Sequence, residues 1–299
     1  MATRVGVILF DLDNTLLLED ESTTRALERT CAAIAPQVGA APAALAAAAR
    51  AAAEELFRGS PVYTYADAMG IWWGEALWGD FAGESEGLRA MRAFVPGFRQ
   101  RVWERATGAS GTAEPTLIEA AIEAFRSARL ATQLVDPDAE TVVVDLARDH
   151  RLVLVTNGAP DVQRAKLART SLAPHFAATV ISAEIEIGKP DPRIFERALA
   201  AVGAEADEAV MVGDSLARDV AGAQAAGVRA IWFDRGAARV EPVAPVPDAR
   251  ITSLREVRPA LSALAPAGAS PRGSPGPRPA GARDASPGRA SRTGDPSAR

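Results

Sequence analysis

The stretch VGVILFDLDNTLL, which runs from Val5 to Leu17, decides the fold of this chain. Its apolar start, broken only by one glycine, is typical of a strand buried on both faces of a parallel sheet. Asp11 and Asp13 follow at the end of this strand, and their i, i+2 spacing lets both side chains point the same way. Two like charges this close are unfavourable unless a cation or a proton relieves them. The stretch therefore predicts a charged site, with an ordinary polar turn as the alternative.

Composition and charge exclude several classes of function. The chain has 299 residues, of which 48% are hydrophobic, and a net charge of −5. Residues 265–299 hold six arginines against two aspartates, so the rest of the chain is more acidic than the net charge suggests. Because phosphate backbones attract basic surfaces, this acidic body argues against nucleic acid as a partner.

Cys31 is the only cysteine, which excludes an intrachain disulfide and a metal site built from cysteines. We expect Cys31 to pack inside a helix, and we expect structural roles for the two histidines, His150 and His175. The N-terminal apolar run is too short for a signal peptide or a membrane span. We therefore expect a cytoplasmic protein, either a monomer or a homodimer, that has no membrane partner.

Three segments differ in their sequence pattern. Residues 19–134 show apolar spacings of helical period separated by proline and glycine, and they predict a helical domain. Residues 135–264 alternate short apolar runs with helical patterns, and together with residues 1–18 they predict an α/β domain with a Rossmann-like parallel sheet flanked by helices. Residues 265–299 contain no large apolar residue, so we expect a disordered tail.

Within the helical segment, the first helix is expected to start at Ser22 or Thr23 and to end before Pro36. Residues 19–22 offer few apolar anchors, so we expect a hinge there. Residues 66–78 are expected to form a single helix.

Four of the five tryptophans lie in this segment: Trp72, Trp73, Trp78 and Trp103. The simpler interpretation places all four in the core of the helix bundle. The alternative is that one or two of them face a substrate cleft.

Further polar motifs follow the later predicted strands, where open parallel sheets bind their ligands. Thr156 directly follows the run RLVLV and offers a hydroxyl group. The backbone N–H groups of Asn157 and Gly158 lie beside it, and we expect both to be free. Lys189 stands in a Gly-Lys-Pro loop, where the proline stiffens the chain beside a cation. Taken singly, Lys189 has the equally simple interpretation of a solvated loop lysine.

Two more carboxylates come from the motif GDSLARD. Asp214 ends the run AVMVG, and Asp219 lies in the first turns of the helix that follows. Asp219 alone would be interpreted as an exposed helical acid. Four such motifs, all beside predicted strand ends, point instead to one shared site.

The order of these motifs, beginning with Asp11-x-Asp13-x-Thr15, resembles the haloacid dehalogenase superfamily of phosphatases. The resemblance covers Val5 to about Phe233. It implies a Mg²⁺-dependent phosphomonoester hydrolase that acts on a small phosphorylated substrate through an aspartyl-phosphate intermediate.

The resemblance also implies roles for individual residues. Asp11 would be the nucleophile, Asp13 the general acid and base, and Lys189 the cation that stabilises the transferring phosphoryl group. The implied metal ligands are Asp11, Asp13 through its backbone carbonyl, Asp214 and, in support, Asp219. The implied substrate-binding residues are Leu12, Thr15, Thr156, Asn157, Gly158 and Lys189.

An acid at position 13 distinguishes phosphatases and phosphomutases from the dehalogenases of the superfamily, because a departing halide needs no proton. The long helical segment between Asp11 and Thr156 resembles a C1-type cap, which in this superfamily closes over the sheet and selects the leaving group. The run Thr156-Asn157-Gly158 and the size of the cap are similar to those of the N-acylneuraminate-9-phosphatase and pyrimidine nucleotidase groups. A phosphomutase and a non-catalytic binding protein on this fold are the alternatives.

Overall fold

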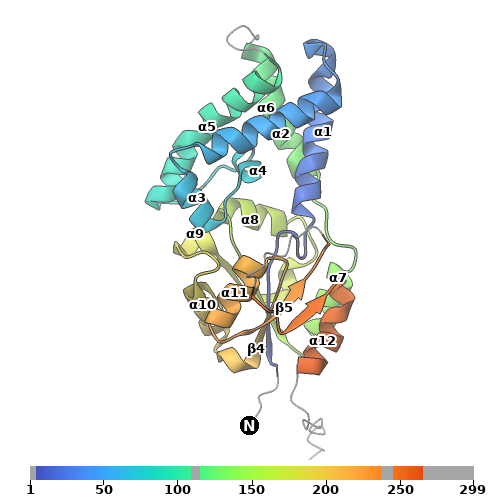
Figure 1. The fold of residues 1–299 in the computed structure, drawn as a ribbon, viewed down its shortest axis with the longest axis vertical. Helices are drawn as coiled ribbons and strands as arrows, with labels where there is room; N and C mark the ends of the chain where they lie inside the picture. The colour runs from blue at the N-terminus through green and yellow to red at the C-terminus, as the bar shows by residue number, and fades with distance from the viewer. Residues whose placement is uncertain (1–4, 109–114, 237–244, 265–299) are drawn as a thin grey trace, which may run out of the picture. The chain divides into compact units, whose positions relative to one another are not determined.

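A six-stranded parallel sheet organises the part of the chain described by the computed structural model, residues 5–108, 115–236 and 245–264 (Figure 1). Its strand order is β3-β2-β1-β4-β5-β6, and every neighbouring pair is parallel. The strands are β1 (Val7–Phe10), β2 (Arg151–Thr156), β3 (Phe176–Ile181), β4 (Ala209–Gly213), β5 (Arg229–Phe233) and β6 (Ala249–Ile251). The segment expected to be a disordered tail, 265–299, lies outside the described residues.

The predicted first strand lies at the centre of this sheet. All four residues of β1 are buried, and β1 pairs with β2 on one side and β4 on the other. Phe10 lies opposite Leu154 of β2 and Val212 of β4, so the three strands end at nearly the same level. The residues that follow these strands therefore meet at one edge of the sheet.

Helices cover both faces of the sheet (Figure 1). Helices α10 (Pro192–Val202) and α11 (Ala221–Ala225) lie on one face, and α7 (Ala139–Leu146) and α12 (Val257–Leu264) lie on the other. The side chains of β1 alternate between the two cores: Val7 and Leu9 pack on the first, and Ile8 and Phe10 on the second. This arrangement confirms the predicted α/β fold.

Between β1 and α7 lies an insertion, residues 19–134, whose described secondary structure contains helices and no strand, as predicted. Its helices are α1 (Glu19–Val38), α2 (Pro42–Arg58), α3 (Tyr63–Met69), α4 (Trp73–Ala76), α5 (Glu86–Ala106) and α6 (Pro115–Ala131). Their apolar faces share a third core, to which Trp73, Trp78 and Trp103 belong as the simpler interpretation expects. The fourth tryptophan, Trp72, is only partly buried.

Two helix boundaries differ from the sequence prediction. Helix α1 begins at Glu19 rather than near Ser22, and it continues through Pro36 to Gly39, which takes a left-handed conformation at the end. The single helix expected over residues 66–78 is broken after Met69. Gly70 adopts a φ of 68° that terminates α3, and α4 starts only at Trp73.

The hinge expected at residues 19–22 stays a prediction, but polar contacts anchor two of its residues. Glu19 and Ser22 are both fully buried. The Glu19 carboxylate accepts a hydrogen bond from the Arg129 guanidinium of α6, and the Ser22 hydroxyl accepts one from the Leu134 N–H at 3.0 Å. Polar contacts replace the apolar anchors that the sequence lacks.

Among the described residues, no single helix has the length and hydropathy to cross a membrane. One bent pair, α1 and α2 at 113° to each other, meets those two criteria jointly.

The buried pair between Arg129 and Glu19 should contribute strongly to stability. Arg129→Met leaves the Glu19 carboxylate buried with only the more distant Lys166, at 3.4 Å, as a cationic partner. Loss of one partner of a buried ion pair costs about 3–5 kcal/mol in the free energy of unfolding. Urea denaturation measures this change.

Arg126→Met is the matched control, since Arg126 lies on the same helix but pairs with the exposed Asp80. Its loss should cost less than about 1 kcal/mol. Equal effects of the two substitutions would contradict the anchoring role of Arg129.

Candidate active site

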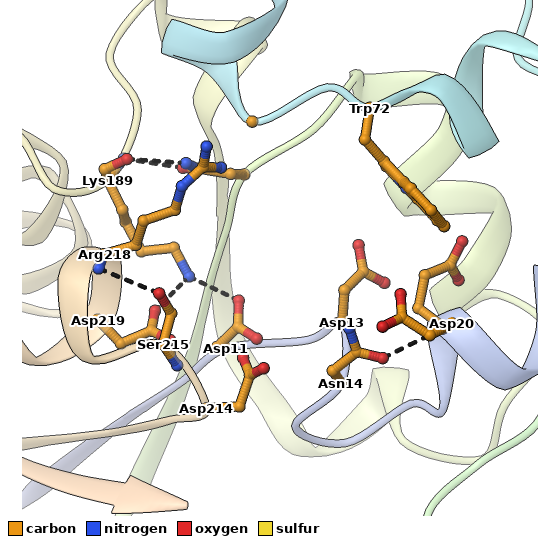
Figure 2. Close-up of a pocket in the computed structure, with 13 residues that line it drawn as sticks. Asp11, Asp13, Asn14, Asp20, Trp72, Lys189, Asp214, Ser215, Arg218 and Asp219 are labelled. Atoms are coloured by element: carbon orange, nitrogen blue, oxygen red, sulfur yellow. Dashed lines mark hydrogen bonds and ion pairs between the residues drawn. The ribbon is translucent and has the colours of Figure 1, made fainter. Parts of the chain in front are cut away.

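Lys189 joins two of the predicted acidic residues (Figure 2). Its Nζ donates hydrogen bonds to Asp11 Oδ1 at 2.6 Å and to Asp219 Oδ1 at 2.7 Å, and all three side chains are buried. Asp219 also accepts a hydrogen bond from the Ser215 N–H at 2.9 Å, which fixes the turn after β4. Lys189 is thus not a solvated loop lysine, and Asp219 is not an exposed helical acid.

Three carboxylates gather beside this lysine. Asp11, Asp214 and Asp219 each place an oxygen within 4.8 Å of the others. Burial raises the pKa of Asp11 to about 6 against the attraction of Lys189, and burial, Asp11 and Asp219 together raise the pKa of Asp214 well above its usual value. The site therefore holds more negative charge than its single lysine balances. Oxygen ligands with excess negative charge are the donor set that suits Mg²⁺.

Asn157 holds the Lys189 loop in place, a role that the sequence did not reveal. Its side-chain Nδ2 donates to the Lys189 carbonyl at 2.9 Å, and its Oδ1 accepts from the Lys189 N–H at 2.8 Å. These two hydrogen bonds hold the Lys189 loop at the end of β2, from which the Lys189 side chain reaches Asp11 at the end of β1. A predicted phosphate contact of Asn157 would use its backbone, so the two roles are compatible.

The other predicted substrate-binding residues have buried side chains. Leu12, Thr15 and Thr156 are fully buried, and the Thr15 hydroxyl donates to Asp11 Oδ2 at 2.9 Å. Thr15 thus orients the carboxylate of Asp11 through its side chain. The part of these residues in substrate binding stays a prediction.

The expectation of a free N–H at Gly158 is wrong. This N–H donates to Ser182 Oγ at 2.9 Å, and the Ser182 hydroxyl lies 2.6 Å from the Met69 carbonyl of the insertion. The hydrogen bonds of Ser182 thus connect the loop after β2 to the end of α3. Ser182 lies directly after β3, where no motif marked it.

Asp13 is held by two residues that the sequence analysis missed. Lys166 and Gln163 of α8 (Pro160–Leu167) donate to Asp13 Oδ2 at 2.8 and 2.9 Å. Both are buried on the face of α8 that also carries the apolar Val162 and Leu167. A lysine and a glutamine within such an apolar stripe are the signal that could have identified them.

Lys166 also binds two carboxylates of the insertion. Its Nζ lies 2.9 Å from Glu75 Oε1 in α4 and 3.4 Å from Glu19 Oε1 in α1. Burial alone would lower the pKa of Lys166, but the three neighbouring carboxylates raise it above its usual value. Burial raises the pKa of Glu75 to about 8 although Lys166 opposes the shift.

The site contains a cavity of about 220 Å³. Its lining includes the predicted site residues Asp11, Asp13, Asn157, Lys189, Asp214 and Asp219. Trp72 and Arg218 line it as well, and Figure 2 shows the Trp72 ring directed toward Asp13 and Asp20. A second cavity of about 370 Å³ shares Gly70, Trp72 and Arg218 with the first. Trp72 therefore fits the alternative interpretation of a tryptophan that faces a cleft.

Comparison with known proteins agrees with this geometry. Residues 5–227 match the family of haloacid dehalogenase-like hydrolases. A phosphoserine phosphatase from Thermus thermophilus is 42% identical over 252 residues, which cover 84% of this chain and 97% of the relative. An N-acylneuraminate-9-phosphatase from Homo sapiens is 31% identical over 170 residues, or 56% of this chain and 68% of the relative.

Among solved structures, a 2-haloacid dehalogenase from Pseudomonas syringae pv. Tomato is similar with a TM-score of 0.55 and 26% identity. The match covers 87% of this chain and all of that one. The family resemblance inferred from the motifs is thereby confirmed.

The close packing of Gly213 against Asp219 leads to a test of the site's rigidity. A Cβ atom at position 213 would lie 2.3 Å from Asp219 Oδ2, so Gly213→Ala must displace this carboxylate from Lys189. We expect the free energy of unfolding to fall by about 1–3 kcal/mol.

Gly6→Ala is the matched control, because a Cβ atom at position 6 meets nothing within 4 Å. Its effect should stay within about 0.5 kcal/mol. If thermal unfolding gives the two variants the same stability, Asp219 is not held as tightly as its contacts suggest.

Proposed function

The chain belongs to the family of haloacid dehalogenase-like hydrolases, and on this premise we propose that it hydrolyses phosphate monoesters of small metabolites. The observation that supports this best is the position of Asp11. Its carboxylate lies at the end of a buried central strand, beside a buried lysine and two further carboxylates. An anionic nucleophile next to cation-binding groups suits attack on a phosphate dianion.

In the proposed reaction, an oxygen of Asp11 attacks phosphorus and the bond to the ester oxygen breaks. Asp13 gives its proton to the departing alkoxide. Asp13 then accepts a proton from the water that hydrolyses the aspartyl-phosphate, which releases inorganic phosphate and regenerates both carboxyl groups. The acid at position 13 supports a phosphatase over a dehalogenase.

Lys189 would hold the phosphoryl oxygens together with the Thr156 hydroxyl and backbone N–H of Asn157. Asp11, Asp214 and the backbone carbonyl of Asp13 would hold Mg²⁺, with Asp219 in support. When bound, Mg²⁺ neutralises negative charge on the nucleophile and the phosphoryl group. The crowding of carboxylates around one lysine supports this assignment.

The leaving group would lie in the two cavities joined at Gly70, Trp72 and Arg218. Residues 19–134 would then act as a cap on a core domain formed by residues 1–18 and 135–264. Phosphoserine is the first substrate to test, because the phosphoserine phosphatase is similar over nearly its full length. Arg218 offers a cation for the carboxylate of such a leaving group.

Asp11→Asn should abolish turnover and leave the fold intact, because the amide has the shape of the carboxylate but is not nucleophilic. We expect a loss of at least about 10³-fold in kcat, measured as phosphate release from phosphoserine and a panel of sugar phosphates and nucleotides. Asp191→Asn, at the N-terminus of α10 and outside the cavity lining, is the control. Wild-type rates in Asp11→Asn would remove Asp11 from its role.

Chelation should test the metal. EDTA should silence the enzyme and Mg²⁺ restore it, while Ca²⁺ should substitute poorly because its coordination is larger and looser. Mg²⁺ should also raise the melting temperature of the wild-type protein, and Asp214→Asn should weaken that rise. Full activity after EDTA, or an equal Mg²⁺ response in Asp214→Asn, would contradict the proposed ligand set.

A further inference from the structure

The proposed mechanism leaves unexplained a group of buried charges beside Asp13. Lys166, Glu75, Glu19 and Arg129 are each no more than 1% exposed. Buried charges are unfavourable unless they are paired, and four of them in one place are rarely needed for stability alone. Lys166 lies at the centre, because it contacts Glu19, Glu75 and the proposed acid–base residue.

The two oxygens of Asp13 have different surroundings. Oδ2 accepts hydrogen bonds from both Lys166 and Gln163. Oδ1 is buried and has no hydrogen-bond partner within the described part of the chain. A carboxylate fixed through one oxygen cannot rotate freely, so the other oxygen keeps one direction. Asp13 lines the cavity with 21% of its side chain exposed, and Oδ1 is an acceptor that the described residues leave unpaired.

We infer that Lys166 and Gln163 are positioning residues that hold the Asp13 carboxylate through Oδ2 in one orientation at the cavity, where it exchanges protons first with the leaving-group oxygen and later with water. This inference rests on the proposed phosphatase function. Among the described residues, Lys166 makes no hydrogen bond or ion pair with Asp11, Asp214 or Asp219. Gln163 also donates to the Thr156 hydroxyl at 2.7 Å and to the Asn157 carbonyl at 2.6 Å. Loss of Lys166 should therefore impair proton transfer more than attack on phosphorus.

Glu75 connects this arrangement to the insertion. It lies in α4, two residues after the cavity-lining Trp73, and its carboxylate accepts a hydrogen bond from the Lys166 ammonium at 2.9 Å. An ammonium has three protons, and Asp13, Glu75 and Glu19 supply three acceptors. Lys166 is therefore held in full, and Asp13 with it, only when α4 is packed against α8. This contact would link the position of the cap to proton transfer by Asp13.

Two substrates separate positioning of Asp13 from general damage. The leaving group of p-nitrophenyl phosphate departs with little help from an acid, whereas the alkoxide of phosphoserine, or of whichever alkyl phosphate the wild type cleaves best, needs a proton. Lys166→Met should reduce kcat/KM, which reports phosphoryl transfer to Asp11 and not the later hydrolysis, by about 10²-fold or more for the alkyl ester, the usual range for general acid catalysis, and by much less for the aryl ester. The alkyl-to-aryl ratio is the ratio of these two kcat/KM values.

The aryl ester gives a second signature with the same variant. Formation of the aspartyl-phosphate should stay fast, while its hydrolysis, which needs Asp13 as a base, should be slow. Stopped-flow absorbance should then show a burst of nitrophenolate close to one per active site. If Lys166 is merely structural, its loss should lower kcat/KM for both esters by the same factor and give no burst. That result would overturn the inference.

Controls come from the same cluster. Arg129→Met removes a buried cation that pairs with Glu19 but does not touch Asp13, so at a temperature where it remains folded it should leave the alkyl-to-aryl ratio unchanged. Glu75→Gln keeps the shape of the side chain and should shift the ratio in the direction of Lys166→Met by a smaller factor. An unchanged ratio in Glu75→Gln would overturn the link to the insertion.

If circular dichroism shows that Lys166→Met does not fold, Gln163→Leu decides the matter. It removes the other contact to Asp13 Oδ2 and leaves no unpaired charge. It also removes the contacts to Thr156 and Asn157, which should affect both esters equally and leave the ratio to report on Asp13. It should shift the same ratio, and an unchanged ratio would overturn the inference. A wild-type protein that cleaves neither ester would contradict the phosphatase proposal itself.

Discussion

The site depends on a buried ammonium group held between two carboxylates. Lys189 reaches Asp11 and Asp219 from a loop that starts beyond β3, so its chain must pass the end of β2 to arrive beside β1 and β4. Asn157, which directly follows β2, holds this crossing in place by binding the Lys189 backbone at two points. Without that cation, the carboxylates at the carboxyl ends of the central strands would repel one another in a buried place.

Much of this could be predicted from the sequence, because parallel sheets obey simple rules. The apolar runs before Asp11, Thr156 and Asp214 are short, rich in branched residues and end in polar groups, so each indicates a buried strand with its carboxyl end marked. Parallel register then brings those ends to one edge without any knowledge of the helices. The topology of the sheet alone therefore predicts that motifs far apart in the sequence lie close together in space.

The sequence predictions for Glu19 and for residues 66–78 differ from the structure for a common physical reason. Both depend on how the insertion packs. Glu19 was expected in a hinge with few apolar anchors, yet it is buried against Arg129, which is 110 residues away in the sequence. The helix expected across residues 66–78 breaks because Gly70 lies close to Asn157 and Arg218, where a Cβ atom would come within 2.5 Å of each side chain. Neither contact leaves a periodic pattern that a sequence could show.

The same packing gives different chemistry to two neighbouring aspartates. Asp11 and Asp13 are two residues apart, yet Asp11 contacts Lys189 and Asp13 contacts Lys166, two lysines from different loops and helices. One carboxylate faces Asp214 and Asp219, and the other faces a buried cluster that includes residues of the insertion. Separate environments are the means by which proteins assign distinct roles to identical groups. In the proposed reaction, this short motif would supply both the nucleophile and the proton carrier because the fold provides each aspartate with its own cation.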